Sequence, residues 1–379
     1  MNLALRDMRR NGLRFVLTTL GLGLLLGVVV SMMGIYEGAL DDALRLPRAS
    51  SPDLWVVQPR TMGPFAEPSR IPRDTRDLVR RIPGVADTGA ITFQSAQTVV
   101  GGRPIRLYVQ GYEPGHLGGP PGIAVGHDIT ESHYQLVVDA SAGLRAGDRV
   151  PLGPFDDRFT VVGLTRGMVS SAGDAVAWLT LLDAQSLQFD VAPALERRER
   201  AAGRSPAQTA DVNAVLVRVD PGVSPSWVAR EIERWKHLSA VTQRQEEGYL
   251  TAFVIEKMQR QIGMFMVILV VVSAVIISLI IYTLTMDKLR AIATLKLIGA
   301  PDRTIVALIV QQALSLGIAG FLVGLALIET FKGHFPRRVL ILAPDVAALF
   351  SVVVVVCLLA SMLGVRAAIR VDPAQALVG

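Results

Sequence analysis

The sequence contains a single cysteine, Cys357. One cysteine cannot form a disulfide within the chain, so the soluble part of the sequence must hold its core by burying apolar side chains. Cys357 lies inside a long apolar run, which favours a packing role over a redox role.

Several motifs that would indicate catalysis are also missing. The chain has no G-x-x-x-x-G-K-[ST] segment, so no P-loop is expected to bind nucleotide phosphates. It has no H-E-x-x-H or paired-cysteine zinc motif and no G-x-S-x-G nucleophile elbow. His127, Asp128 and His133 are close in sequence, but their spacing places them on no common face of a helix or strand, and we expect surface residues there. We predict no catalytic residue, cofactor site or metal site.

Charged residues and histidine are missing from four long segments. A helix of about 20 residues spans the ~30 Å hydrocarbon core of a bilayer, and one central charge would cost about 2.5–3.5 kcal/mol. We therefore predict four transmembrane helices. The lack of any charge inside them argues against an ion-coupled carrier. The segments are 15–36, 261–286, 304–328 and 346–365, of which the shortest has 20 residues and the longest 26.

The first apolar run could instead be a cleaved signal peptide, because basic residues precede it. It is too long for that role and lacks a small-x-small exit before Glu37, so we expect a retained helix. Ten basic residues flank the runs on one side of the membrane, and three lie in the loop between the third and fourth runs. The larger set predicts the cytoplasmic side. Both termini are then inside, with residues 1–14 as an amphipathic cytoplasmic arm, and residues 37–260 are outside.

The 224 residues between the first and second runs have the pattern of a mixed domain. Short apolar runs such as Leu54–Val57 and Ala214–Val219 predict strands, and Gly101-Gly102 predicts a tight hairpin turn. Residues 74–81 and 225–235 have helical patterns. The expected fold class is membrane α-helical, with one plus three transmembrane helices and a large α+β extracytoplasmic domain, in two subdomains, inserted between the first and second. We expect the Gly- and Pro-rich residues 111–126, and residues 194–211, to be mobile loops. Residues 246–260 predict a helical stalk that leads into the second span.

The loop between the second and third spans, residues 287–303, predicts a short helix rich in Ala, Leu, Lys and Arg. Gly299 fits the position after the helix end, and Pro301 fits the start of the next helix. Such a segment is either a rigid element facing the cytoplasm or a tight connection between two helices, and the residues alone leave both open.

The run Ala293-Thr-Leu-Lys-Leu-Ile-Gly-Ala300, followed by an apolar helix with Gly317, Gly320 and Gly324, resembles the signature of FtsX-like permease domains. The basic N-terminal arm, the segment Val217-Arg-Val-Asp-Pro-Gly222 and the ending Arg370-Val-Asp-Pro373 also resemble this family, whose external part is the MacB-like core. Within the family, three segments look most like DevC-type permeases of glycolipid exporters: Pro52-Asp-Leu-Trp-Val-Val-Gln-Pro59, Tyr108-Val-Gln-Gly-Tyr-Glu-Pro114 and Ala293-Thr-Leu-Lys296.

The resemblance implies a type VII ABC transporter permease that works with a separate cytoplasmic ATPase and a second permease copy, and is not itself an enzyme. It implies residence in the bacterial inner membrane, and a periplasmic adaptor and outer-membrane channel that export a lipid-like or hydrophobic substrate. Residues 261–379 would form the FtsX-like permease domain. The residues that would contact the ATPase are Leu295, Lys296, Leu297, Ile298 and Gly299.

Two pairs of glycines have the spacing of close helix contacts in membranes. Gly23-x-x-x-Gly27 and Gly320-x-x-x-Gly324 would allow helices to pack tightly in a permease dimer, although glycine is common in membrane helices. Two other functions stay open: a non-transporting FtsX-like subunit that activates an extracytoplasmic enzyme, and a membrane-anchored enzyme, for which no catalytic constellation is present.

Overall fold

Four long helices contain the charge-free segments of the sequence. The computed structural model describes residues 12–65, 67, 69–153, 157–189, 211–235, 237–287, 293–294, 298, 301–335 and 337–369. Within these residues, four helices are long and apolar enough to cross a membrane, which confirms the predicted spans. They are α2 (Gly12–Ser50), α8 (Glu256–Asp287), α10 (Asp302–Phe331) and α11 (Ala343–Ile369), with a 3-10 turn η3 (Lys332–His334) after α10.

The chain divides into two compact units. The helical unit contains the residues up to Gly38 and from Met258 onward, and the second unit is Ala39–Lys257. In the helical unit, apolar side chains from all four helices share one buried cluster, which includes Leu26, Ile281, Leu316 and Val353. Many aliphatic residues of α8 remain exposed, among them Val267 and Val275, as expected for a helix that faces lipid.

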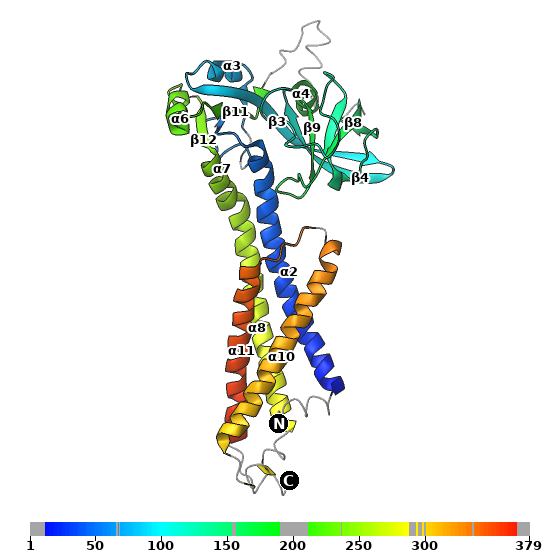
Figure 1. Cartoon of the computed structure of the whole chain (residues 1–379), viewed down its shortest axis with the longest axis vertical. Helices are drawn as coiled ribbons and strands as arrows, with labels where there is room; N and C mark the ends of the chain where they lie inside the picture. The colour runs from blue at the N-terminus through cyan, green and yellow to red at the C-terminus, as the bar shows by residue number, and fades with distance from the viewer. Residues whose placement is uncertain are drawn as a thin grey trace. The chain divides into compact units, whose positions relative to one another are not determined.

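The second unit is built on one mixed sheet, whose strand order is β12-β1-β11-β3-β4-β9-β6-β8-β5, with β7 paired to β8. The 16-residue strand β3 pairs with β11 over Val85–Ile91 and with β4 over Thr92–Val100 (Figure 1). The sheet is therefore continuous, and the two expected subdomains form one unit. Its strands are β1 (Leu54–Val57), β3 (Val85–Val100), β4 (Arg103–Tyr112), β5 (Val125–Gly126), β6 (Gln135–Asp139), β7 (Arg149–Leu152), β8 (Asp157–Thr165), β9 (Ala175–Thr180), β11 (Ala214–Val219) and β12 (Ser239–Thr242).

Short helices and a small second sheet complete this unit. The small sheet pairs β2 (Ile71–Pro72) with β10 (Asp211–Val212). The helical elements are α3 (Thr75–Arg80), η1 (Ala140–Ala142), α4 (Leu181–Phe189), α6 (Pro225–Glu233), α7 (Gln243–Tyr249) and the π-helix η2 (Leu250–Ile255). Three buried clusters follow the sheet, with Val215, Trp178 and Leu136 among their members.

The predicted hairpin turn at Gly101-Gly102 is confirmed. Val100 pairs with Arg103, and the two glycines have φ of 57° and 77°, the left-handed values that a two-residue type I′ turn requires. The first helix differs from expectation, because α2 continues from Tyr36, the end of the apolar run, to Ser50. Its polar extension carries the i,i+4 ion pair Asp41–Arg45, which supports a helix outside the membrane.

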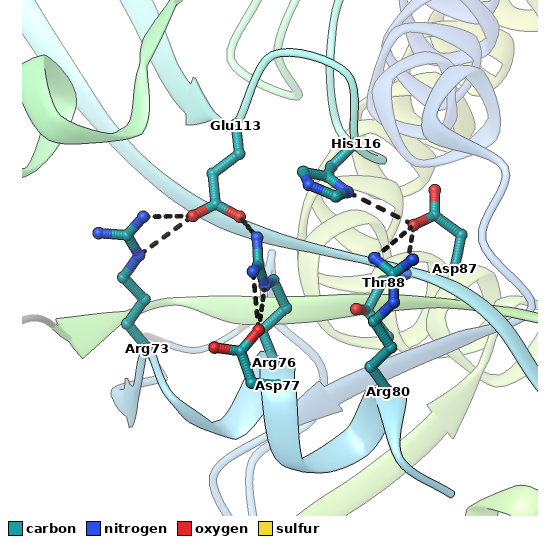
Figure 2. Close-up of polar contacts among 8 residues, drawn as sticks. All are labelled: Arg73, Arg76, Asp77, Arg80, Asp87, Thr88, Glu113 and His116. Atoms are coloured by element: carbon teal, nitrogen blue, oxygen red, sulfur yellow. Dashed lines mark hydrogen bonds and ion pairs between the residues drawn. The ribbon is translucent and has the colours of Figure 1, made fainter. Parts of the chain in front are cut away.

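The Gly- and Pro-rich residues 111–126 are not the mobile loop that their composition predicts. Leu117 is buried, Gln110 donates a hydrogen bond to the Gly118 carbonyl at 2.7 Å, and Gly89 of β3 leaves room for the Leu117 backbone. Glu113 also pairs with Arg73 and Arg76, and His116 lies beside Asp87 (Figure 2). These contacts hold the segment to β3 and α3. The other expected loop, residues 194–211, lies outside the described residues except for Asp211.

Candidate functional site

We call the second unit, Ala39–Lys257, the soluble unit. The two polypeptide connections between it and the membrane helices arise from neighbouring strands. The chain passes from α2 into β1, and from β12 through α7 and η2 into α8. β1 and β12 are antiparallel partners, with Leu54 opposite Thr242. We call the residues around this pair the stalk junction: Arg48, Trp55, Gln243, Glu246 and Glu247.

Polar contacts connect the two sides of the stalk junction. Trp55 Nε1 donates to Gln243 Oε1 at 2.8 Å, and Arg48 pairs with Glu247 at 2.9 Å. The Arg48 hydrogen bond lowers the pKa of Glu247. Thr242 begins α7 with a capping box formed with Gln245, which fixes the direction in which α7 leaves β12.

Arg45 connects the end of α2 to the loop between β8 and β9. Its Nη1 atom donates to the Gly167 carbonyl at 2.8 Å, while its guanidinium pairs with Asp41 on the preceding turn. Leu46 on the same helix is buried in a cluster with Trp55 and Trp178. The last turns of α2 are thus part of the soluble unit and not a free linker.

Glu246 is the most unusual side chain of the stalk junction. It is fully buried, and Gly63, at a φ of 80°, lies against its carboxylate, where a β-carbon would overlap the oxygens. Among the described residues neither oxygen has a hydrogen-bond partner of good geometry. Burial raises the pKa of Glu246 to about 8, and the nearby Phe65 amide lowers it by less. Local sequence signals do not indicate this burial, because a Glu in a polar, helix-favouring stretch is normally exposed.

The predicted glycines lie at one helix crossing within a single chain. Gly23 and Gly27 of α2 face Gly320 and Gly324 of α10, and all four are buried. A β-carbon built on Gly324 would lie 2.6 Å from the Gly23 carbonyl oxygen and 2.9 Å from the Gly27 amide nitrogen. The two motifs therefore pack against each other within one chain, and their role in a dimer interface stays a prediction.

Most of the predicted ATPase contact lies outside the described residues, including Leu295, Lys296, Leu297 and Gly299. Ile298 is described and is 85% exposed, and its amide donates to the Thr294 carbonyl, as in a helical turn. Pro301, the expected first residue of the next helix, occupies the N-cap position of α10, so the helix begins one residue later at Asp302. The exposed apolar side chain of Ile298 is available for contact with a partner.

The two histidines that lie close to Asp128 in sequence have separate partners. His127 Nδ1 lies 2.7 Å from the backbone oxygen of Asp128, whereas His133 Nδ1 lies 2.7 Å from the Asp183 carboxylate. Asp128 accepts a hydrogen bond from the Tyr112 hydroxyl. Within the described residues, no group of three or more His, Cys, Asp or Glu side chains is placed to hold a metal ion.

Comparison with known families identifies both parts of the chain. Residues 15–235, more than half of the sequence, match the MacB-like periplasmic core domain, and residues 263–373 match the FtsX-like permease C-terminal domain. The chain belongs to the MacB/FtsX family of ABC transporter permeases. Membership of this family implies an ATPase partner and a place in the cell membrane.

Some relatives of this permease match along nearly the whole chain. An uncharacterized ABC transporter permease of Mycobacterium tuberculosis is 25% identical over 377 residues, and one of Mycobacterium bovis is 24% identical over 383 residues; 99% of each chain is covered. One similar solved structure is the extracellular domain of the noncanonic ABC-type transporter YknZ from Gram-positive bacteria, with 12% identity and a TM-score of 0.35 over 51% of this chain and 100% of that one. Another is the periplasmic region of MacB from Actinobacillus actinomycetemcomitans, with 11% identity and a TM-score of 0.35 over 52% of this chain and 91% of that one.

The glycine crossing predicts a selective loss of stability. Gly324→Ala places a methyl group against the α2 backbone, which cannot move aside as a flexible side chain would. We expect the permease in detergent to lose about 1–3 kcal/mol of stability, read as a lower thermal unfolding midpoint. Gly21→Ala is the matched control, since nothing lies within 4 Å of its β-carbon position. Equal midpoints for the two variants would contradict the crossing.

The buried Glu246 predicts that the permease becomes less stable as the pH rises. The folded state keeps this proton up to a pH of about 8, whereas the unfolded chain releases it near the ordinary glutamate pKa of 4.5. The folded state therefore binds more protons in that window, and its stability falls from pH 4.5 to pH 8. Glu246→Gln should match the unchanged protein at about pH 5 and exceed its unfolding midpoint at about pH 9.

Glu247→Gln is the control for this titration. Glu247 is partly exposed and its pKa is lowered by Arg48, so its replacement should slightly reduce stability at about pH 9, where the parent ion pair is fully formed. A Glu246→Gln protein that keeps the full pH dependence of the parent would disprove the assignment.

Proposed function

We propose that this permease is the membrane subunit of a mechanotransmission ABC transporter, in which ATP hydrolysis by a separate ATPase changes the conformation of the periplasmic domain. The observation that supports this best is the pairing of β1 with β12, the strands from which both membrane connections leave. Hydrogen-bonded strands resist sliding, so a shift of one helix along the other would rotate the edge of the sheet. The domain would then move as a unit.

The local geometry supports a lever at this position. Arg45 and Arg48 attach the end of α2 to the soluble unit through side-chain contacts, and Trp55 joins β1 to the start of α7. On the other connection, η2 replaces the α-helical hydrogen-bonding pattern by a π-helix, the kind of irregularity that often marks a functional site within a helix. Side-chain contacts thus hold the connection from α2 to β1. The connection from β12 to α8 contains a π-helical turn at which the helix can adjust its twist.

The remaining parts of the proposal come from the family resemblance. The ATPase would contact residues 295–299 on the cytoplasmic side, with both termini inside, and a second permease copy would complete the membrane unit. Export of a lipid-like or hydrophobic substrate through a periplasmic adaptor and an outer-membrane channel, as for DevC-type permeases, is the proposed output. No ATPase site is assigned to this chain.

The contact with the ATPase is tested by reversing one charge. Lys296→Glu should reduce co-purification of the partner ATPase, or the ATP turnover of the complex, by about tenfold. The substitution replaces a positive charge that attracts the ATPase by a negative charge that repels it. Gly299→Pro should act in the same direction by disturbing the end of the helix that the sequence predicts for this loop. Lys332→Glu is the matched control, since Lys332 lies in the connection between α10 and α11. Unchanged association and turnover for both loop variants would refute the assignment.

The stalk junction is tested by exchanging the charges of its ion pair. Arg48 and Glu247 are 54% and 28% exposed, so Arg48→Glu should cost about 1 kcal/mol or less. It should nevertheless abolish the nucleotide-dependent change in hydrogen–deuterium exchange of β12 and α7 in the complex with the ATPase. The double exchange Arg48→Glu with Glu247→Arg should restore that change.

ATP turnover serves as the internal control for this experiment. It should stay within about twofold in both variants, because neither residue of the ion pair shares a partner, among the described residues, with the proposed ATPase contact. An exchange response that survives Arg48→Glu unaltered would remove the stalk junction from the transmission path.

A further inference from the structure

A cavity of about 250 Å³ lies among α2, α8 and α11 in the helical unit. It is found where the apolar runs end, since Glu37 follows the first run, Ile262 lies at the start of the second, and Asp345 precedes the fourth. Its lining residues are Met33, Tyr36, Glu37, Ile262, Gly263, Met266 and Asp345. In the orientation proposed above, this level is the outer boundary of the bilayer.

No described residue that lines the cavity compensates its negative charge. Two carboxylates, Glu37 and Asp345, line it, and none of the described lining residues is basic. Neither carboxylate forms a salt bridge with a described residue, and their negative charges repel each other. Asp345 lies in the first turn of α11, where the helix dipole offsets part of its charge, but Glu37 has no such support. A cation between the two would remove their repulsion.

The rest of the lining is apolar and of a kind that suits an organic cation. Met33 and Met266 supply flexible, polarizable thioethers, which adapt to irregular ligands. Tyr36 supplies an aromatic ring, whose face attracts ammonium groups. Aliphatic and aromatic walls with a few charged groups are the usual composition of a small-molecule site, whereas a metal ion would need more oxygen ligands at short distance.

Gly263 keeps the cavity open. It lines the cavity from α8 together with Ile262 and Met266, and nothing lies within 4 Å of the position its β-carbon would take. A larger residue there would extend into free space and would not collide with another helix. The glycine thus has no packing role among the described residues that explains it.

We propose that this cavity binds the head of a cationic amphiphile, a molecule with an amine or quaternary ammonium group and an alkyl chain. The ammonium lies between Glu37 and Asp345, and the chain extends into the bilayer beside Met33 and Met266. The inference concerns binding alone and does not depend on the proposed coupling to an ATPase. Its test therefore uses no ATP turnover.

The test is photolabelling of the full-length permease in phosphatidylcholine nanodiscs. The probe is dodecylamine with a diazirine in its alkyl chain, and the matched probe is dodecanol with the same diazirine. The amine should label peptides from the cavity-lining turns of α2, α8 and α11 saturably and at least about tenfold more than the alcohol. Equal labelling by the two probes would overturn the proposal without any variant.

Two variants with different effects test the assignment of residues. The double change Glu37→Gln with Asp345→Asn removes the charge, and Gly263→Leu fills the space. Each should reduce labelling by the amine at least about tenfold. The controls are Glu329→Gln, an exposed carboxylate outside the cavity, and Gly21→Leu, another glycine with open space around its β-carbon position. Unchanged labelling in both cavity variants would overturn the site.

Competition identifies the source and the class of the ligand. Displacement of the probe by phosphatidylethanolamine in the nanodisc would identify a resident lipid of the membrane. Displacement by unlabelled dodecylamine alone would identify a single-chain amphiphile delivered to the site, and both results support an amphiphile. Displacement by ethylamine at the same concentration would contradict the role of the alkyl chain.

Discussion

The antiparallel pairing of β1 with β12 is the constraint on which the rest of the structure depends. The chain leaves the sheet for the membrane helices at two points that are far apart in sequence, at Ser50 and after Thr242, yet the ladder places Leu54 opposite Thr242. Because backbone hydrogen bonds join these strands, neither connection can shift without deforming an edge of the sheet. This pairing is the physical basis of the proposed mechanotransmission, because two flexible linkers would absorb a displacement.

Two neighbouring glutamates of the stalk junction have pKa values shifted in opposite directions. The pKa of Glu247 is lowered by its partner Arg48, so it stays ionised, while burial raises the pKa of Glu246 and favours its neutral form. A buried carboxyl without a full set of hydrogen bonds costs stability. Natural sequences tend to retain such costs where a position serves function, which agrees with the place of Glu246 at the base of the connection to α8.

Local sequence signals predict those parts of the fold that depend on neighbouring residues. Charge-free runs locate the four spans, apolar runs locate strands such as β1 and β11, and Gly101-Gly102 locates the hairpin. The features that local signals miss depend on partners far away in the chain. Residues 111–126 have the composition of a mobile loop, but Glu113 meets Arg73 and Arg76 (Figure 2). Glu246 lies in a polar stretch, but the loop around Gly63 covers it.

The small residues of α2 show how its movement is limited. Gly23 and Gly27 lie against α10, and further along the same helix Gly34 and Gly38 lie against the segment that joins α10 to α11. Leu340 donates a backbone hydrogen bond to the Gly34 carbonyl at 2.9 Å. Rotation of α2 about its own axis would replace these glycines by bulkier neighbours, which do not fit between backbones. These contacts therefore fix the rotation of α2 relative to α10 and to the segment that follows it.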